Sequence, residues 1–154
     1  MNNLNLKNIT NDLLDTFLKA GNVAKKISEN GVKITIKQDN SPVTDGDLMV
    51  NKLLCDKIKK LTPDINIISE ETVNVKKKNK EKDFWLIDPI DGTRDYIKKK
   101  DEYTLNAALI LNFKPEIGII YAPKKGRLFF SYGKGSAFEI FNGEKKILNC
   151  KKKT

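Results

Sequence analysis

Arginine is nearly absent from this sequence of 154 residues, although the net charge is +9. Only Arg94 and Arg127 are arginines among 29 basic residues, so lysine carries almost all of the positive charge. Bidentate contacts to nucleic-acid bases depend chiefly on arginine, and the lysines here occur in solvated runs such as KKKNKEK at residues 76–82. We therefore expect no dedicated nucleic-acid binding, and the charge leaves open only a weak association with anionic surfaces, including membranes.

The sequence also lacks long apolar runs and paired cysteines. No stretch approaches the roughly 18 apolar residues of a membrane helix, and the first residues have no basic-then-apolar signal, so we expect no transmembrane segment and a cytoplasmic location. Cys55 and Cys150 stand far apart without metal-ligand spacing, which predicts free thiols. The length of 154 residues, 39% of them hydrophobic, predicts one domain with its own core.

Two amphipathic helices are predicted in the first half of the chain. Apolar residues at three- and four-residue spacing predict a helix over residues 8–29. The turn-forming sequence QDNSPVTDGD at 38–47 precedes a second helix that extends to Leu61, with Thr44 or Asp45 as its cap.

Strand patterns dominate the rest of the sequence. The predicted strands are residues 32–37, 65–69, 84–88, 103–111, 116–123, 127–132 and 136–141. The first alternates like a half-buried strand, a lysine-rich loop separates the second from the third, and a short helix is expected at 92–99. Short connections between the later strands favour antiparallel neighbours. The predicted fold class is α+β, with two helices packed on one face of a mostly antiparallel sheet.

Acidic residues stand where two of these buried strands end. Glu70 and Glu71 follow one strand, and Asp88 and Asp91 flank Pro89 after the apolar run FWLI. Carboxylates that converge repel one another unless a cation neutralises them, and Mg²⁺ prefers such oxygen ligands. The sequence therefore predicts a Mg²⁺ site at the ends of these strands.

The residues that follow suggest a phosphate site beside the metal. The bend imposed by Pro89 can direct the carbonyl of Ile90 into the same cavity. Gly92 and Thr93 stand at a helix start, where backbone N–H groups bind phosphate. Lys37 either contacts phosphate too or is simply an exposed lysine at the end of its strand.

A purely structural interpretation accounts for the same residues. Asp91 would cap the helix after it, the Asp88–Pro89 pair would form an ordinary turn, and Glu70 and Glu71 would be a solvated pair. Residue types and spacing alone do not decide between the two interpretations.

Four segments in a fixed order carry a family resemblance. They are DNSPVTDGD at 39–47, ISEE at 68–71, WLIDPIDGT at 85–93 and GIIYAP at 118–123. In this order they resemble the inositol monophosphatase superfamily of Mg²⁺-dependent, lithium-sensitive phosphatases, and within it the bacterial 3'(2'),5'-bisphosphate nucleotidases. The similarity runs from about residue 9 to about residue 149.

The resemblance implies a role for each matching residue. The metal ligands would be Glu70, Asp88, the Ile90 carbonyl and Asp91. Asp47 and Thr93 would be catalytic residues that orient and deprotonate the attacking water, and Glu70 would help to position it. The residues in contact with the substrate would be Glu70, Ile90, Asp91, Gly92 and Thr93.

Two features depart from the family pattern. Gly46 stands in the first turn of the second helix, where glycine costs about 1 kcal/mol of helix stability. A WDxAA-like motif, which in the family supplies another metal-binding aspartate, is absent after Asp91. Residues 1–154 therefore resemble a single N-terminal metal-binding domain of the layered αβαβα phosphatase fold, without the C-terminal half.

The resemblance implies a phosphoric monoester hydrolase that converts 3'-phosphoadenosine 5'-phosphate to AMP in sulfur metabolism. A small phosphorylated nucleotide would be the substrate and Mg²⁺ the cofactor. An inositol or sugar monophosphatase is the alternative within the same class, and an inactive fragment that serves as a binding or assembly partner is the alternative from another class. A sheet edge left exposed by a missing half also predicts self-association or a complementing C-terminal half.

Overall fold

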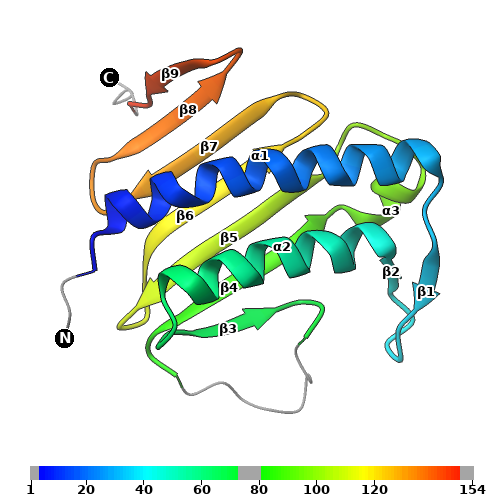
Figure 1. The fold of residues 1–154 in the computed structure, drawn as a ribbon, viewed down its shortest axis with the longest axis horizontal. Coiled ribbons are helices and arrows are strands. Elements are labelled where there is room, and N and C mark those ends of the chain that lie inside the picture. The colour runs from blue at the N-terminus through cyan, green and yellow to red at the C-terminus, as the bar shows by residue number, and fades with distance from the viewer. Residues whose placement is uncertain (1–3, 73–80, 150–154) are drawn as a thin grey trace, which may run out of the picture.

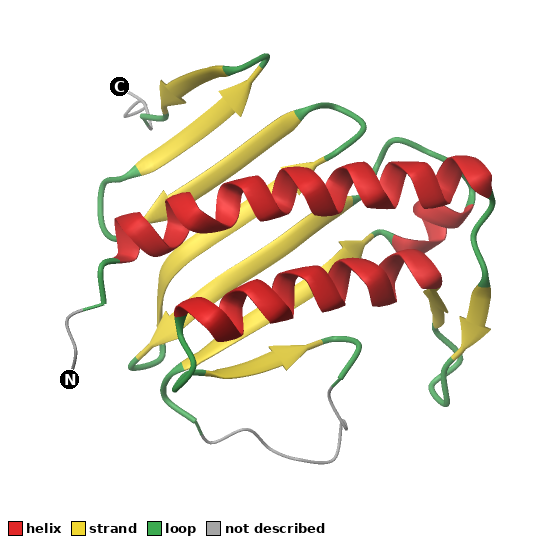
Figure 2. Ribbon diagram, viewed as in Figure 1, coloured by secondary structure: helices red, strands yellow, loops and turns green. Residues whose placement is uncertain are grey.

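The computed structural model describes residues 4–72 and 81–149. Two long helices lie side by side across one face of a twisted sheet (Figures 1 and 2). Most of the lysine-rich run at 76–82, and Cys150, fall outside the described residues. Within the described part, neither long helix has a stretch apolar enough to cross a membrane.

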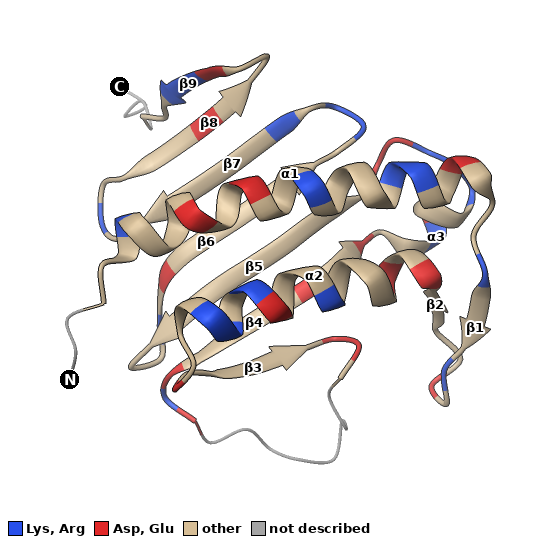
Figure 3. Cartoon of the chain, in the orientation of Figure 1, with Lys and Arg blue, Asp and Glu red and all other residues tan. Residues whose placement is uncertain are grey.

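The helices confirm the predicted amphipathic pattern. Helix α1 spans Leu6–Asn30, and the side chain of Asn5 caps it by accepting from the backbone N–H of Asn8 at 3.0 Å. Helix α2 spans Asp45–Leu61 with Thr44 as its N-cap. Basic and acidic residues are interspersed along the outer sides of both helices (Figure 3). Their apolar sides face the sheet.

The main sheet has seven strands, which follow one another in chain order from β3 to β9. Their bounds are β3 Asn66–Ser69, β4 Phe84–Asp91, β5 Thr104–Leu111, β6 Lys114–Ala122, β7 Arg127–Tyr132, β8 Ala137–Phe141 and β9 Glu144–Ile147. The β3–β4 pair is parallel and all later pairs are antiparallel. A five-residue helix, α3, spans Thr93–Ile97 between β4 and β5. The predicted fold class is confirmed, and β9 extends the sheet beyond the strands that the sequence predicted.

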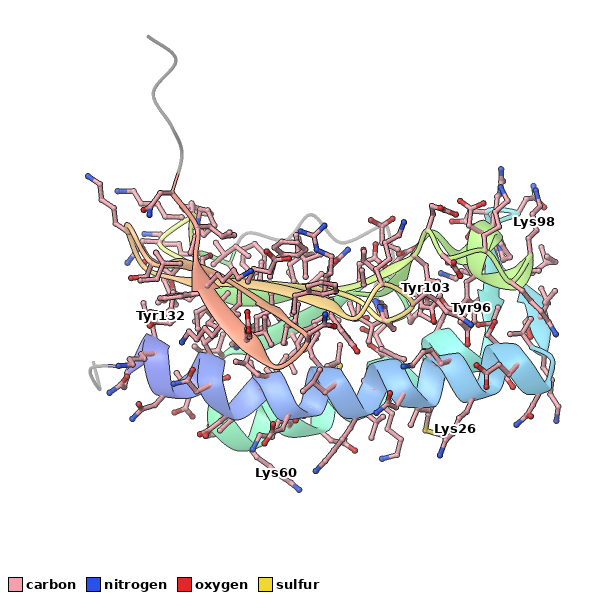
Figure 4. All side chains as sticks on the ribbon, turned by 90° about the horizontal axis from the view of Figure 1, so that it is seen from above. Lys26, Lys60, Tyr96, Lys98, Tyr103 and Tyr132 are labelled. Atoms are coloured by element: carbon pink, nitrogen blue, oxygen red, sulfur yellow. The ribbon has the colours of Figure 1, made fainter. Side chains whose placement is uncertain are left out.

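The hydrophobic core fills the space between the helices and the near face of the sheet (Figure 4). Its fully buried side chains include Leu13, Phe17, Leu54, Ile58, Trp85, Ile87, Leu109 and Ile119. Each such side chain contributes roughly 1.5–3 kcal/mol by leaving water. Side chains alternate along a strand, so the neighbours of these residues point to the opposite face, where Leu86 and Ile120 are each 49% exposed.

The strand predicted at residues 32–37 differs from the structure. Strand β1 spans only Ile34–Ile36, and its side chains are exposed rather than half-buried. It pairs with β2, Pro42–Thr44, in a separate two-stranded hairpin, so part of the predicted turn is also a strand. The alternating pattern correctly predicted extended backbone, but within the hairpin only β2 is partly buried, with Val43 and Thr44 covered, whereas β1 is exposed.

Candidate active site

The candidate site lies where β4 loses its regular pairing with β5. Asp88 is opposite Asn106 and Asp91 is opposite Thr104, and the register shifts between these pairs. Pro89 lies inside the irregular segment, where its missing N–H group disrupts the ladder. Figure 3 shows acidic residues at the end of β4, after β3 and at the start of α2, all toward the same end of the sheet.

Asp88 stands two positions after the exposed Leu86 on β4, so strand alternation places its side chain on the helix-free face of the sheet. Its Oδ1 atom is buried and has no hydrogen-bond partner among the described residues. Burial, together with the charges of Glu70, Asp91 and Asp47, raises the pKa of Asp88 to about 7. A carboxylate surrounded by other acids in this way is stabilised in its ionised form by a nearby cation.

Asp47 is 1% exposed and sits in the first turn of α2. It forms a capping box with Thr44: its Oδ2 accepts from the Thr44 backbone N–H at 2.8 Å, and its own N–H donates to Thr44 Oγ1 at 3.2 Å. Burial raises the pKa of Asp47, and the bonds from Thr44 and Thr93 partly oppose this shift. Asp47 is therefore held in one position by the start of the helix.

Thr93 connects Asp47 with the irregular segment of β4. Its hydroxyl oxygen lies 3.3 Å from Asp47 Oδ1 and 3.0 Å from the carbonyl oxygen of Ile90, and the single hydroxyl proton serves both acceptors. The structure thus brings together Asp47, Thr93 and the Ile90 carbonyl, although Asp47 and Thr93 are 46 positions apart in the sequence. The Ile90 side chain is buried in the core.

Glu70 and Glu71 have opposite environments, although they are neighbours in the sequence. The Glu70 side chain is 51% exposed, and its backbone N–H donates to the carbonyl of Ile87 at 3.1 Å, which keeps it next to β4. The Glu71 side chain is only 4% exposed and accepts from Lys37 Nζ. The structural interpretation of a solvated pair is therefore wrong for Glu71.

Lys37 is also less exposed than a lysine at a free strand end. Its side chain is 23% exposed and forms the ion pair with Glu71. Burial lowers the pKa of Lys37, but the hydrogen bond to Glu71 and the charges of Glu71, Glu70 and Asp47 raise it more, so the net shift is upward. No local sequence pattern indicates this pair, because 34 positions separate its members.

Gly92 joins β4 to α3 in a conformation that favours glycine. Its φ is +94°, and a Cβ atom here would lie 2.8 Å from the carbonyl oxygen of Glu102. It is the N-cap residue of α3, and no side chain caps this helix, so the alternative role of Asp91 as a cap is wrong. Asp91 is exposed and accepts from Asn106 Nδ2 at 3.4 Å. A hollow of about 340 Å³ adjoins Asp91 and Gly92.

The donors at this site fit a hard divalent cation. Within residues 4–72 and 81–149, no three acidic, histidine or cysteine side chains are arranged so that they could hold a metal ion by themselves. The unpartnered Asp88 oxygen and the neighbouring acids nevertheless supply the oxygen chemistry that Mg²⁺ selects. Mg²⁺ commonly takes only one or two protein carboxylates and completes its shell with water and substrate phosphate.

Comparison with known proteins identifies the class. The model of the inositol monophosphatase family matches residues 5–154, and the chain belongs to this family. The 3'(2'),5'-bisphosphate nucleotidase CysQ of Aggregatibacter actinomycetemcomitans is 30% identical over 135 residues, which cover 86% of this chain and 50% of that protein. The protein of the same name from Buchnera aphidicola is 33% identical over 151 residues, which cover 94% of this chain and 57% of the relative.

Solved structures agree with this assignment. An inositol monophosphatase from Thermotoga maritima is 27% identical with a TM-score of 0.71, covering 84% of this chain and 49% of that one. An inositol monophosphatase/NADP phosphatase solved with Mg²⁺ and phosphate has a TM-score of 0.75 at 21% identity, covering 87% of this chain and 51% of that one. The chain thus spans about half the length of the relatives that it matches.

Proposed function

We propose that this chain is the metal- and water-binding part of a Mg²⁺-dependent phosphatase that removes the 3'-phosphate of 3'-phosphoadenosine 5'-phosphate to give AMP. The observation that carries the proposal is the contact of Thr93 with both Asp47 and the Ile90 carbonyl, beside the unpartnered oxygen of Asp88. The choice of substrate rests on the nucleotidase relatives, which are 30% and 33% identical to this chain.

Asp47 and Thr93 are suited to proton transfer from an attacking water. Burial raises the pKa of Asp47, which makes it a better base than an exposed aspartate. Thr93 donates its proton toward Asp47, so its hydroxyl oxygen can accept a proton from the water. As the water oxygen bonds to phosphorus, the water proton passes to Thr93 Oγ1 and the hydroxyl proton of Thr93 passes to Asp47. The bond from phosphorus to the 3' oxygen breaks, and that oxygen takes a proton from solvent.

The acidic residues at the strand ends would bind the cofactor. Glu70, Asp88, Asp91 and the Ile90 carbonyl are the proposed ligands. Divalent cations bound there would lower the pKa of water and offset the charge of the phosphate oxygens. Gly92 and Thr93 stand next to these ligands, where their backbone N–H groups would contact phosphate.

Phosphate release from two substrates tests the proposal. With saturating Mg²⁺, we expect release from 3'-phosphoadenosine 5'-phosphate, inhibition by lithium, and slower release from inositol 1-phosphate. In a folded, complete version of this site, Asp47→Asn should lower the rate by roughly 100-fold or more, because it removes the base, while Mn²⁺ affinity measured by calorimetry changes little.

Other outcomes of these experiments would support a different function or contradict the role of Asp47. Faster release from inositol 1-phosphate supports an inositol or sugar monophosphatase, which the family match also allows. Absence of release from both substrates at metal saturation supports an inactive fragment that acts as a binding or assembly partner. Loss of Mn²⁺ affinity in Asp47→Asn would contradict the role of Asp47 as a base.

The helix-free face of the sheet is the proposed binding surface for the rest of the active site. The chain spans about half the length of its curated relatives, and Asp88 lies on the same face as the exposed Leu86 and Ile120. A domain that packed against these apolar side chains would also cover the carboxylates. We propose that its occupant is a segment equivalent to the remaining half of the relatives.

A further inference from the structure

Lys37 is held in place in the β1–β2 hairpin, which leads into helix α2. Its backbone N–H donates to the carbonyl of Ser41 at 2.8 Å, and its own carbonyl accepts from the N–H of Asn40 at 3.0 Å. Strand β2 of this hairpin ends at Thr44, the cap of α2 that holds Asp47. A shift of Lys37 would therefore move the segment that positions Asp47.

Glu71 is fixed in the turn after β3. Its backbone N–H donates to Ser69 Oγ at 3.3 Å, and that hydroxyl donates to Asn51 Oδ1 of α2 at 2.6 Å. Its carboxylate faces Lys37 with both oxygens, since Nζ lies 3.0 Å from Oε1 and 2.9 Å from Oε2. The neighbouring Glu70 carboxylate lies farther away, at 3.8 Å from Nζ.

We propose that Lys37 is a positioning residue that acts through Glu71. This inference rests on the proposed metal site. The Lys37–Glu71 pair joins the β1–β2 hairpin, which leads to Asp47, to the turn after β3, which carries Glu70. Lys37 also engages both carboxylate oxygens of Glu71. In this turn, the carboxylate that remains to face Asp88 is therefore that of Glu70. Among the described residues, Lys37 supplies the ion pairs of both Glu70 and Glu71.

The two possible roles of Lys37, as a positive charge alone or as a positioning residue, predict opposite changes in divalent-cation affinity when Lys37 is removed. If Lys37 acted only as a positive charge 3.8 Å from Glu70, its removal would tighten the binding of a divalent cation. If it positions Glu70, its removal weakens binding, because residues that orient metal ligands typically contribute roughly 10- to 100-fold to affinity.

Calorimetric titration with Mn²⁺ distinguishes the two roles in the full chain. Lys37→Met should bind Mn²⁺ at least tenfold more weakly than the wild type. Lys37→Arg keeps the ion pair and should stay within about threefold. Lys52→Met is the matched control, because Lys52 pairs with Asp56 on the exposed side of α2, and its affinity should equal that of the wild type.

Lys37→Met leaves the buried carboxylate of Glu71 without its partner and could therefore prevent folding. The double variant Lys37→Met/Glu71→Gln removes this problem. It leaves the net charge unchanged, so charge alone predicts wild-type affinity, whereas positioning predicts at least a tenfold loss. Affinity equal to or tighter than that of the wild type, in either folded variant, overturns the inference. A wild-type chain that binds no Mn²⁺ overturns the proposed metal site, and this inference with it.

Discussion

At the scale of single residues, Asp88 gives the strongest support for the proposed cation site. A buried oxygen without a partner costs free energy, and several acids around one carboxylate add to that cost. A divalent ion bound at the proposed site would offset both costs. The same group should therefore control how the metal-free chain responds to pH.

We expect Asp88→Asn to stabilise the metal-free chain at pH 8. The pKa of Asp88 is about 7 in the folded state against a usual value of 3.8. Below the usual value both states hold the proton. As pH rises toward 7 the unfolded chain ionises first, so the folded state loses stability across this window. The gain in the variant should be of the order of 1 kcal/mol, because solvent screens a half-buried group.

Urea denaturation in EDTA at pH 4 and pH 8 measures this effect. The difference between variant and wild type should be small at pH 4 and positive at pH 8. Asp56→Asn, on the exposed side of α2, is the control and should show no such gain at pH 8. Equal stabilisation by Asp88→Asn at both pH values would contradict the view that ionisation of the Asp88 carboxylate destabilises the folded state.

At the scale of the elements, Gly46 is explained by the packing of α2 against α3. The sequence alone shows a glycine that weakens the first turn of a helix. In the structure a Cβ atom at Gly46 would lie 2.4 Å from the hydroxyl oxygen of Tyr96, which donates to the carbonyl of Ala24 in α1 at 2.7 Å. Tyr96 thus links α3 to both long helices, and glycine makes the space for it.

Gly46→Ala should destabilise the chain by about 1–3 kcal/mol, although alanine is the better helix former. In a Tyr96→Phe background the same change should cost less, because the closest atom is gone. Relief will be partial, since ring carbons of Tyr96 also lie 2.8 Å from the added atom. Urea denaturation of the single and double variants measures this coupling.

Asn22→Ala, at an exposed position of α1, is the control and should change stability by less than about 0.5 kcal/mol. Additive costs for the Gly46 and Tyr96 changes would mean that the two residues do not share this space in solution.

At the scale of the whole molecule, the two faces of the sheet are unequal. The helices cover one face, and the other presents Leu86, Ile120 and a hollow of about 220 Å³ that Phe129 and Ala137 help to line. An apolar sheet face open to water favours association. The surface lies beside Asp88, so a covering domain and the acidic site would meet.

Ile120→Lys should therefore reduce self-association of the isolated chain. The wild type should show a mass that rises with concentration in light-scattering chromatography, and the variant should remain a monomer at the same concentration. Leu18→Lys, on the outer side of α1, is the matched control and should behave like the wild type. A monomeric wild type at all concentrations would contradict self-association through this face and leave the complementing half as its occupant.

The sequence by itself determined the helices, most strands and the fold class, because apolar periodicity and turn residues are local signals. Residue order also indicated Asp47, Glu70, Asp88 and Asp91 as candidates, through the family resemblance. Local patterns could not show that β1 lies outside the main sheet, nor that Glu71 is buried while Glu70 is exposed.

Only the tertiary structure decided these points, because they depend on which distant segments pack together. The parallel pairing of β3 with β4 sets Glu70 beside Asp88, and the register shift in β4 brings the Ile90 carbonyl to Thr93. The burial of Lys37 against Glu71 follows from the same arrangement. The pairing of Glu70 with β4 and of Lys37 with Glu71 joins segments whose separation in sequence gives no signal of their proximity in space.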